Sequence, residues 1–453
     1  MVFSSITFIY LFLPICLIFY YISPKRIKNF TLLIFSLLFY AFQTPKFLII
    51  MLICLLLTYI NGLLIEKYKN KIHYISSLLI CLVPLILFKY IDFFITNINQ
   101  LINNNIPLLK LVLPLGISFY TFQMLTYLID IKRGTIKAEK NFLDLSLYIC
   151  FFPQLVAGPI VKYSDMKNQI QNRIINLECI GQGIFLFTIG VGKKVLIANQ
   201  LGELCNLYKI GDSSILLTWL YMITYSLQVY FDFSGYSTMA IGLGKMFGFE
   251  LPINFNYPFI CNNIKDFWKR WHITLSSFFK DYVYIPLGGS RKGIPRTILN
   301  LFIVWFLTGF WHGADWNFIC WGLYFFILLV LEKYIIKDKL PKFLQRIITI
   351  ILIGISFIIF GTSNITDIFL ILKNLIIGTF CDNSTLFIIR NNIILLIFGI
   401  IGATPLIKNL YIKYIKNNKI SYFVEPIIIA IILLLSTAYL IDGSFNPFLY
   451  FRF

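Results

Sequence analysis

Length, composition and charge together indicate a membrane protein. The chain has 453 residues, of which 58% are hydrophobic and only 13% are charged, and its mean hydropathy is +0.81. Soluble proteins have roughly 45–50% apolar and about 25% charged residues, so this composition excludes an ordinary soluble domain. The net charge of +19 does not indicate a nucleic-acid partner, because the lysines and arginines cluster in short loops between apolar runs. Such clusters are typical of cytoplasmic loops in membrane proteins.

Many of the apolar runs approach or exceed the roughly 20 residues that a helix needs to cross hydrocarbon. The sequence therefore predicts an all-α polytopic membrane protein. The nine cysteines lie mostly within these runs and form no CxxC pair and no Cys/His ligand spacing. Cysteines in that setting usually pack as small core residues, so we expect no metal site and no bound cofactor.

The N-terminal part of the chain contains five apolar runs whose flanking loops alternate in charge. The runs are Ile6–Ile22, Phe30–Phe42, Phe47–Ile65, Ile72–Ile98 and Leu109–Ile131. Basic residues follow the first, third and fifth runs, whereas the asparagine-rich segment 97–105 carries no charge. The alternation predicts five membrane-crossing helices, with the basic loops in the cytoplasm and the N-terminus outside.

The next apolar run, Leu143–Val161, breaks this alternation. It contains Pro153, Gly158 and Pro159, and basic residues flank it at both ends. A segment that begins and ends on the cytoplasmic side should be re-entrant. Because broken backbone is tolerated at membrane depth only where it is buried in protein or lines a cavity, we expect this segment to border a cavity; a simple packing kink is the alternative.

Two further segments combine apolar and charged residues. Ile184–Cys205 carries Lys193 and Lys194 in its middle, and we expect it to be interfacial or strongly tilted. Ile215–Phe231 is a clearer span. Residues 251–297 form the least hydrophobic part of the chain, in which basic and aromatic residues alternate. This mixture predicts amphipathic helices at the cytoplasmic interface.

The remaining apolar runs predict the C-terminal spans. They are Ile298–Phe310, Phe318–Leu331, Ile347–Phe360, Leu386–Ile401 and Pro426–Leu440, and we expect the weaker apolar segment Ile368–Phe380 to be interfacial. The whole chain, residues 1–453, is predicted to be a single membrane domain with about ten to twelve spans and interfacial helices.

His312 is the first candidate for chemistry, because it lies between two long apolar runs in a chain with only three histidines. A titratable side chain at that position is costly, so a function is the default expectation. The alternative is a hydrogen-bonded histidine at a helix end. In an unbroken helix, one face would carry Trp305, Gly309, His312 and Trp316. Gly309 and Gly313 would then let another chain or a substrate approach the ring.

A neutral imidazole suits removal of a proton from a hydroxyl that attacks an activated carbonyl. Trp311 would support the site, and Trp316, Asn317 or backbone amides could stabilise the resulting oxyanion. His272 and Asp232 are further polar side chains in apolar surroundings.

The basic segment 251–297 would suit a polyanionic acyl donor such as a coenzyme A ester. The candidate donor-binding residues are Lys269, Arg270 and Arg291. The alternative is ordinary cytoplasmic charge in contact with lipid headgroups.

The motifs around these residues are dense and specific. They are Leu113–Gln123 (LPLGISFYTFQ), Phe152–Val161 (FPQLVAGPIV), Tyr230–Ser237 (YFDFSGYS), Phe267–Ser276 (FWKRWHITLS), Tyr284–Gly289 (YIPLGG) and Gly309–Gly313 (GFWHG), together with the ends Met1–Ser5 and Asn446–Phe453. With these motifs the chain resembles, over essentially its whole length, the membrane-bound O-acyltransferases, and in particular the bacterial alginate O-acetyltransferase branch.

The resemblance implies a ring of tilted helices around a central funnel, with the catalytic core in residues 109–335. It implies that His312 is the signature histidine, that His272 is the second histidine of the family, and that Asp232 belongs to the family's Phe-Asp-Phe-Ser-Gly-Tyr element. His272 could position the substrate rather than act as a base, and Asp232 could be a structural hydrogen-bonding residue.

The resemblance also implies a reaction and a place in the cell. Acetyl-CoA would be the donor substrate, and the acetyl group would cross the plasma membrane of a bacterium to hydroxyls of a surface polysaccharide such as alginate, another exopolysaccharide or peptidoglycan. An extracytoplasmic partner with a serine-hydrolase-like fold would often take part. D-alanyl transfer to teichoic acid is an alternative, and a non-catalytic scaffold or channel for polysaccharide export is another.

Overall fold

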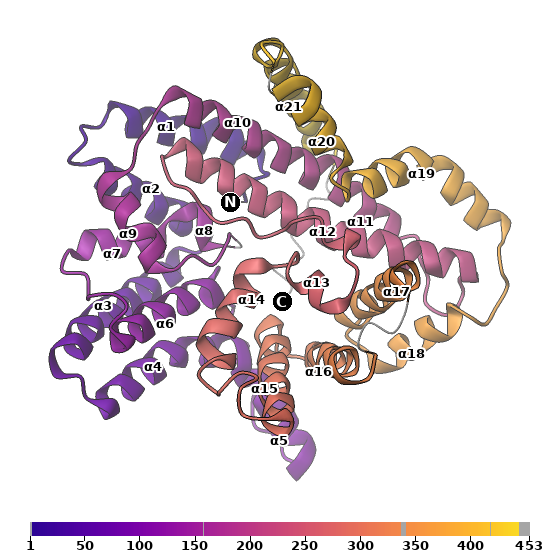
Figure 1. Ribbon diagram of the computed structural model, residues 1–453, viewed down its shortest axis with the longest axis horizontal. Helices are drawn as coiled ribbons and strands as arrows, with labels where there is room; N and C mark the ends of the chain where they lie inside the picture. The colour runs from indigo at the N-terminus through magenta and orange to yellow at the C-terminus, as the bar shows by residue number, and fades with distance from the viewer. Residues whose placement is uncertain (1, 157, 337–340, 417, 444–453) are drawn as a thin grey trace. The chain divides into compact units, whose positions relative to one another are not determined.

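The computed structural model describes residues 2–156, 158–336, 341–416 and 418–443, and all of its regular elements in these ranges are helices (Figure 1). The prediction of an all-α protein is therefore confirmed. The chain folds as two compact units, Met1–Phe187 with Met239–Pro252 (unit 1), and Thr188–Thr238 with Ile253–Phe453 (unit 2). The terminal motif Asn446–Phe453, Met1 and Ala157 lie outside the described residues.

Unit 1 contains the N-terminal helices. They are η1 (Phe8–Phe12), α1 (Leu13–Ile22), α2 (Lys28–Gln43), α3 (Pro45–Tyr68), α4 (Lys71–Leu85), η2 (Ile86–Tyr90), α5 (Ile91–Ile102), α6 (Ile117–Arg133), α7 (Phe142–Cys150), α8 (Phe152–Leu155), α9 (Tyr163–Asn172) and most of α10 (Leu177–Gly192). The last turns of α12 (Ile215–Met246) also belong to this unit.

Unit 2 contains the rest of α12 and the C-terminal helices. They are η3 (Lys193–Ala198), α11 (Asn199–Cys205), η4 (Pro258–Ile260), α13 (Ile264–Trp268), α14 (Ile273–Phe279), η5 (Lys280–Tyr284), α15 (Ile294–His312), α16 (Trp316–Leu331), η6 (Glu332–Ile336), α17 (Lys342–Gly361), α18 (Ile365–Asn374), α19 (Asn383–Gly402), α20 (Leu406–Tyr411), η7 (Ile412–Lys416) and α21 (Ser421–Asp442).

Eight helical segments of the described residues are long and apolar enough to cross a membrane. They are Pro45–Tyr68, Lys71–Ile102, Leu177–Cys205, Ile294–His312, Trp316–Ile336, Lys342–Gly361, Asn383–Gly402 and Ser421–Asp442. Two shorter apolar helices cover Phe8–Ile22 and Lys28–Phe42. These segments confirm a polytopic membrane protein, whereas the arrangement of helices around a funnel and the orientation of the loops stay predictions.

Two boundaries in unit 1 differ from the prediction. Segment 97–105 was expected to be a loop, but α5 continues through Ile102 and ends where Asn103 adopts a left-handed φ of 53°. The run Leu109–Ile131 was expected to be helical throughout, but α6 begins only at Ile117. Pro107 and Pro114 account for the late start, because proline lacks the donor N–H and disfavours helical backbone in the preceding residue.

The prediction of broken backbone within Leu143–Val161 is confirmed. Helix α7 ends at Cys150, and the single turn of α8 is followed by non-helical chain. A Cβ atom on Gly116 would lie 2.3 Å from the carbonyl oxygen of Leu155, so the start of α6 packs directly against the end of α8. Two of the sequence motifs, 113–123 and 152–161, therefore meet within unit 1.

Residues late in unit 1 complete the packing of its N-terminal helices. The Tyr20 hydroxyl donates a hydrogen bond to the carbonyl oxygen of Phe247 at 2.8 Å. The rings of Phe151 and Phe249 lie 4.8 Å apart, and the Arg173 guanidinium lies 4.6 Å from the centre of the Phe249 ring. The last turns of α12 and the chain after it are thus part of the core of unit 1.

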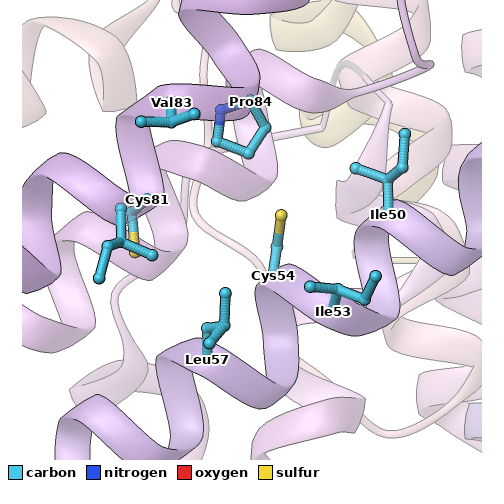
Figure 2. Close-up of a pocket in the computed structure, with 8 residues that line it drawn as sticks. Ile50, Ile53, Cys54, Leu57, Cys81, Val83 and Pro84 are labelled. Atoms are coloured by element: carbon cyan, nitrogen blue, oxygen red, sulfur yellow. The ribbon is translucent and has the colours of Figure 1, made fainter.

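Helices α3 and α4 line an open apolar hollow beside Pro84. Figure 2 shows Ile50, Ile53, Cys54 and Leu57 on one helix facing Cys81, Val83 and Pro84 on the other, with Ile80 completing the lining. Pro84 cannot donate the backbone hydrogen bond that would hold it to the preceding turn. Because the lining is apolar, this hollow suits hydrocarbon and not a reaction that moves protons.

In unit 2, α15 and α16 form a tightly packed pair (Figure 1). A Cβ atom on Gly309 would lie 2.3 Å from the carbonyl oxygen of Phe318, and one on Gly322 would lie 2.3 Å from the carbonyl oxygen of Trp305. Glycines at both positions let the two backbones approach, as small residues commonly do between membrane helices.

A buried ion pair joins η3 to α12 in unit 2. The Lys194 ammonium nitrogen lies 2.6 Å from a carboxylate oxygen of Asp232, and each side chain is only 4% exposed. Gly235, one turn further along α12, allows this close packing, because a Cβ atom there would lie 3.0 Å from the carbonyl oxygen of Gly190. Removing one partner of such a pair leaves an uncompensated charge in the interior.

Replacing Gly309 with alanine is expected to lower the free energy of unfolding by about 1–3 kcal/mol, because the added methyl group overlaps the backbone of α16. Thermal unfolding of the purified protein in detergent would measure the effect. Gly181→Ala is the control, since no atom lies within 4 Å of a Cβ at that helical position. Equal melting temperatures for the two variants would contradict the importance of the close approach.

Asp232→Asn is expected to lower the free energy of unfolding by about 3–5 kcal/mol, because it leaves Lys194 buried and charged. The double variant Lys194→Met/Asp232→Leu should recover most of the loss. Lys245→Met is the control, since its partner Glu250 is 84% exposed and the pair is 3.9 Å apart. If the double variant is no more stable than Asp232→Asn, the ion pair is not the reason for the loss.

Candidate active site

His312 is the last residue of α15, and the chain leaves the helix directly after it. Gly313 is extended, and α16 begins at Trp316, where the Asp315 carboxylate accepts a hydrogen bond from the Trp316 backbone N–H at 2.7 Å. The predicted face that joined Trp305, Gly309, His312 and Trp316 is therefore wrong at its last position. Trp316 starts a separate helix and its side chain is 50% exposed.

The two glycines beside His312 admit a close neighbour, as predicted. Gly309 contacts the backbone of α16, and a Cβ atom on Gly313 would lie 2.2 Å from the ring of Phe318. Another chain segment does approach the histidine, as expected. It is the next helix of the same pair, and it occupies the space beside both glycines.

Aromatic rings surround the imidazole of His312, which is 6% exposed. The ring centre of His312 lies 4.9 Å from those of Trp311 and Trp321 and 5.2 Å from that of Phe360, with interplanar angles of 71°, 83° and 86°. Trp321 and Phe360 also contact each other, at 5.3 Å. Because these rings limit the access of water, electrostatic interactions with the imidazole are stronger here than in solvent.

His272 approaches the same aromatic group from another part of unit 2. It precedes α14, is completely buried, and its ring centre lies 6.0 Å from that of Trp311. Its Nδ1 lies 3.3 Å from the side-chain oxygen of Asn254. Burial lowers the pKa of His272 to about 3, so the ring is neutral at physiological pH. Trp311 therefore contacts both histidines.

Asp232 lies on α12, where its carboxylate is engaged by Lys194. The next residue, Phe233, contacts the His272 ring with centres 4.7 Å apart. Within the Phe-Asp-Phe element, Phe233 is thus the residue that contacts the candidate site. Asp232 holds α12 in place through its ion pair with Lys194.

Asn317 and Trp316 are the first two residues of α16. The Asn317 side-chain amide donates to the carbonyl oxygen of Phe360 at 2.9 Å, which ties α16 to α17. One of its two amide hydrogens is therefore engaged in packing. The Trp316 side chain is half exposed, in contrast to the buried Trp311.

Trp321 and Asn254 are candidate site residues that the sequence analysis missed. The indole Nε1 of Trp321 is buried and has no hydrogen-bond partner among the residues that the structure describes. Its ring contacts His312, so its N–H is a candidate donor to an oxyanion. A signal for Trp321 is present in the sequence. Phe318, Trp321 and Phe325 follow one another at helical spacing, which indicates the buried face of a helix that begins after His312.

The predicted amphipathic region 251–297 forms short helices whose aromatic side chains are buried. Trp268 packs against Trp305 and Phe325, with ring centres 4.6 and 4.9 Å away. Lys269 and Arg291 are exposed, whereas the Arg270 guanidinium is paired with the Asp266 carboxylate at 3.0 Å. Two of the three candidate donor-binding cations therefore face outward, and Arg270 is partly neutralised.

No group of three or more His, Cys, Asp or Glu side chains in the described part of the chain lies close enough together to hold a metal ion. The described residues of this site offer for chemistry the buried imidazoles of His272 and His312 and the indole N–H of Trp321, with exposed cations nearby in sequence. This set suits acid–base catalysis of group transfer.

Comparison with known proteins agrees with this chemistry. A peptidoglycan O-acetyltransferase of Helicobacter pylori is 34% identical, with 100% of this chain and 98% of the relative covered. A probable alginate O-acetylase, AlgI, of Pseudomonas aeruginosa is 38% identical over 81% of this chain and 73% of the relative. A teichoic acid D-alanyltransferase of Bacillus subtilis is 34% identical over 56% of this chain and 68% of the relative.

The family model of the membrane-bound O-acyltransferases matches residues 6–371. This range includes His272, His312 and the helices that hold them. The match identifies an acyltransferase, because the relatives that align with most of the chain are named as O-acetylating enzymes. The chain belongs to the membrane-bound O-acyltransferase family.

Proposed function

We propose that this acyltransferase moves an acetyl group from cytoplasmic acetyl-CoA to a hydroxyl of a polysaccharide outside the membrane. The observation that carries the proposal is the buried His312 imidazole, held by aromatic rings within the region that the family model matches. Two relatives that align with four-fifths of the chain or more are named for acetylation of peptidoglycan and of alginate. These names support acetyl as the group that is transferred.

His312 acts as the general base in this proposal. Its ring removes the proton of the attacking hydroxyl while the oxygen bonds to the thioester carbonyl carbon. The carbon–sulfur bond then breaks, and the imidazolium returns the proton to the coenzyme A thiolate. In this proposal the Trp321 indole N–H, which is buried beside His312, stabilises negative charge on the carbonyl oxygen during the exchange.

The exposed Lys269 and Arg291 are proposed to attract the phosphates of acetyl-CoA. The hydroxyl that accepts the acetyl group belongs either to the glycan or to a serine of an extracytoplasmic partner with a serine-hydrolase-like fold. The proposed location is the plasma membrane of a bacterium. D-alanyl transfer to teichoic acid ranks second, because that relative aligns with only 56% of this chain.

His312→Ala is expected to reduce acetyl transfer by about 10²–10⁴-fold, because the variant lacks the proposed base. The assay uses membranes supplied with labelled acetyl-CoA, followed by analysis of O-acetyl esters in the cell-envelope glycans. His73→Ala is the matched control, since His73 lies on α4 of unit 1. A folded, membrane-inserted His312→Ala protein with full transfer would refute the role of His312.

Trp321→Phe is expected to lower kcat by about 10²-fold while KM for acetyl-CoA changes little, because the N–H donor to the oxyanion is lost. A smaller aromatic ring is kept beside His312, and the control variant accounts for the loss of indole volume. Trp305→Phe is the control, since Trp305 belongs to the same cluster and its ring lies 6.5 Å from that of Trp321. Equal rates for the two variants would exclude Trp321 as the donor.

A further inference from the structure

Asn254 forms a buried polar cluster with His272 and Thr274 in unit 2. Asn254 lies in the chain before η4 and is 1% exposed. Its side-chain oxygen accepts hydrogen bonds from the backbone N–H of Thr274 at 3.1 Å and from the Thr274 hydroxyl at 3.0 Å. The same oxygen lies 3.3 Å from Nδ1 of His272. Three potential donors therefore converge on one acceptor atom.

These contacts determine which nitrogen of His272 carries the proton. A backbone N–H can only donate, so the amide atom that faces Thr274 must be the oxygen of Asn254 and not its nitrogen. A carbonyl oxygen can only accept, so the contact with His272 is a hydrogen bond only if Nδ1 is protonated. The cluster thus selects the Nδ1–H tautomer.

The other ring nitrogen is then an acceptor with an available lone pair. Because burial lowers the pKa of His272 to about 3, the neutral ring carries a single proton, and Nε2 has none. Nε2 is buried and has no hydrogen-bond partner among residues 2–156, 158–336, 341–416 and 418–443. An unpaired buried acceptor destabilises the folded state, so its presence here calls for a partner that the described residues do not supply.

The backbone of His272 is strained as well. Its φ of 42° and ψ of 53° are left-handed, which a side chain with a Cβ atom seldom adopts. The Asn254 segment holds this conformation, since the backbone N–H of Ile273 donates to the carbonyl oxygen of Asn254 at 3.0 Å. Strain of this kind persists where the surrounding structure fixes it, and it concentrates at functional sites.

We propose that Asn254 is a positioning residue that holds His272 in the Nδ1–H tautomer, so that Nε2 accepts a hydrogen bond from an O–H or N–H group of a bound substrate. This group is distinct from the hydroxyl that gives its proton to His312. It is a second hydroxyl of the acyl acceptor or an amide N–H of the acyl donor. The inference rests on the proposed acyl transfer.

The tautomer can be measured without any assay of activity. The chain has only three histidines, so protein labelled with ¹⁵N-histidine and reconstituted in lipid bilayers gives three sets of imidazole resonances in solid-state NMR. His272→Gln assigns the set of His272. We expect a protonated Nδ1 and an unprotonated Nε2 at neutral pH. A protonated Nε2 in the wild-type protein would overturn the proposal, and this test needs no variant of Asn254.

Variants of the cluster then test the role of Asn254. Asn254→Leu removes the acceptor and should populate the other tautomer, whereas Asn254→Asp keeps an acceptor and should retain Nδ1–H. Thr274→Val is the matched control, because it removes one hydrogen bond to the same oxygen and leaves the contact with His272 in place. A wild-type spectrum for Asn254→Leu would contradict the positioning role.

Kinetics identify the substrate group that binds Nε2. We expect Asn254→Leu to lower transfer by about 10²-fold, as misplacement of a group that orients a substrate can do, with Thr274→Val close to the wild-type rate. An increased KM for acetyl-CoA would assign the acyl donor, and an increased KM for isolated cell-envelope glycan would assign the acceptor. A changed tautomer with unchanged transfer would overturn the proposal. A wild-type protein without acyl transfer would contradict the proposed function, while its spectrum would still decide the tautomer.

Discussion

The close approach of α15 and α16 is the constraint on which the candidate site depends. Gly309 and Gly322 let the two backbones come together, and this packing brings the Trp321 ring against His312. Phe360 on α17 then closes the group, with Asn317 bound to its carbonyl oxygen. In hydrocarbon no hydrophobic effect drives two helices together, so small residues and interhelical hydrogen bonds have to do so.

The site obtains its polar groups from segments that are far apart in the sequence of unit 2. Asn254 and His272 come from the short helices and loops between α12 and α15, and His312 comes from the end of a long apolar helix. Trp311 contacts the rings of both histidines, and the side-chain oxygen of Asn254 lies within hydrogen-bond distance of Nδ1 of His272. Aromatic side chains fill such a space with apolar rings, and the tryptophans among them also bring an indole N–H that can donate a hydrogen bond.

Features of the fold that depend on residues close together in the sequence could be predicted. Hydropathy located the long apolar helices, since each must satisfy its own backbone in lipid. His312 and His272 were found because a histidine in apolar surroundings is costly and because the motifs around them are specific. Pro107 and Pro114 are local signals that α6 begins late. The prediction of a helix over Leu109–Ile131 gave more weight to the apolar composition than to these prolines.

Contacts across the fold could not be predicted in this way. The break after His312 moved Trp316 to a new helix, and only the structure shows that Trp321 replaces it beside the imidazole. Asn254 is an ordinary asparagine in the sequence, and its role depends on the placement of Thr274 and His272 around its oxygen. Likewise, nothing near Asp232 in the sequence identifies Lys194 as its partner.

The order in which unit 1 can be completed follows from its discontinuous chain. Its helices up to α9 precede most of α12 in the sequence, yet Tyr20 and Phe151 need Phe247 and Phe249 as packing partners. A ribosome that has released the first half of the chain has therefore not yet supplied the residues that finish the first unit. Until these residues are synthesised, the packing surfaces of the early helices stay exposed in the membrane. An insertion factor or chaperone can bind those surfaces during this interval.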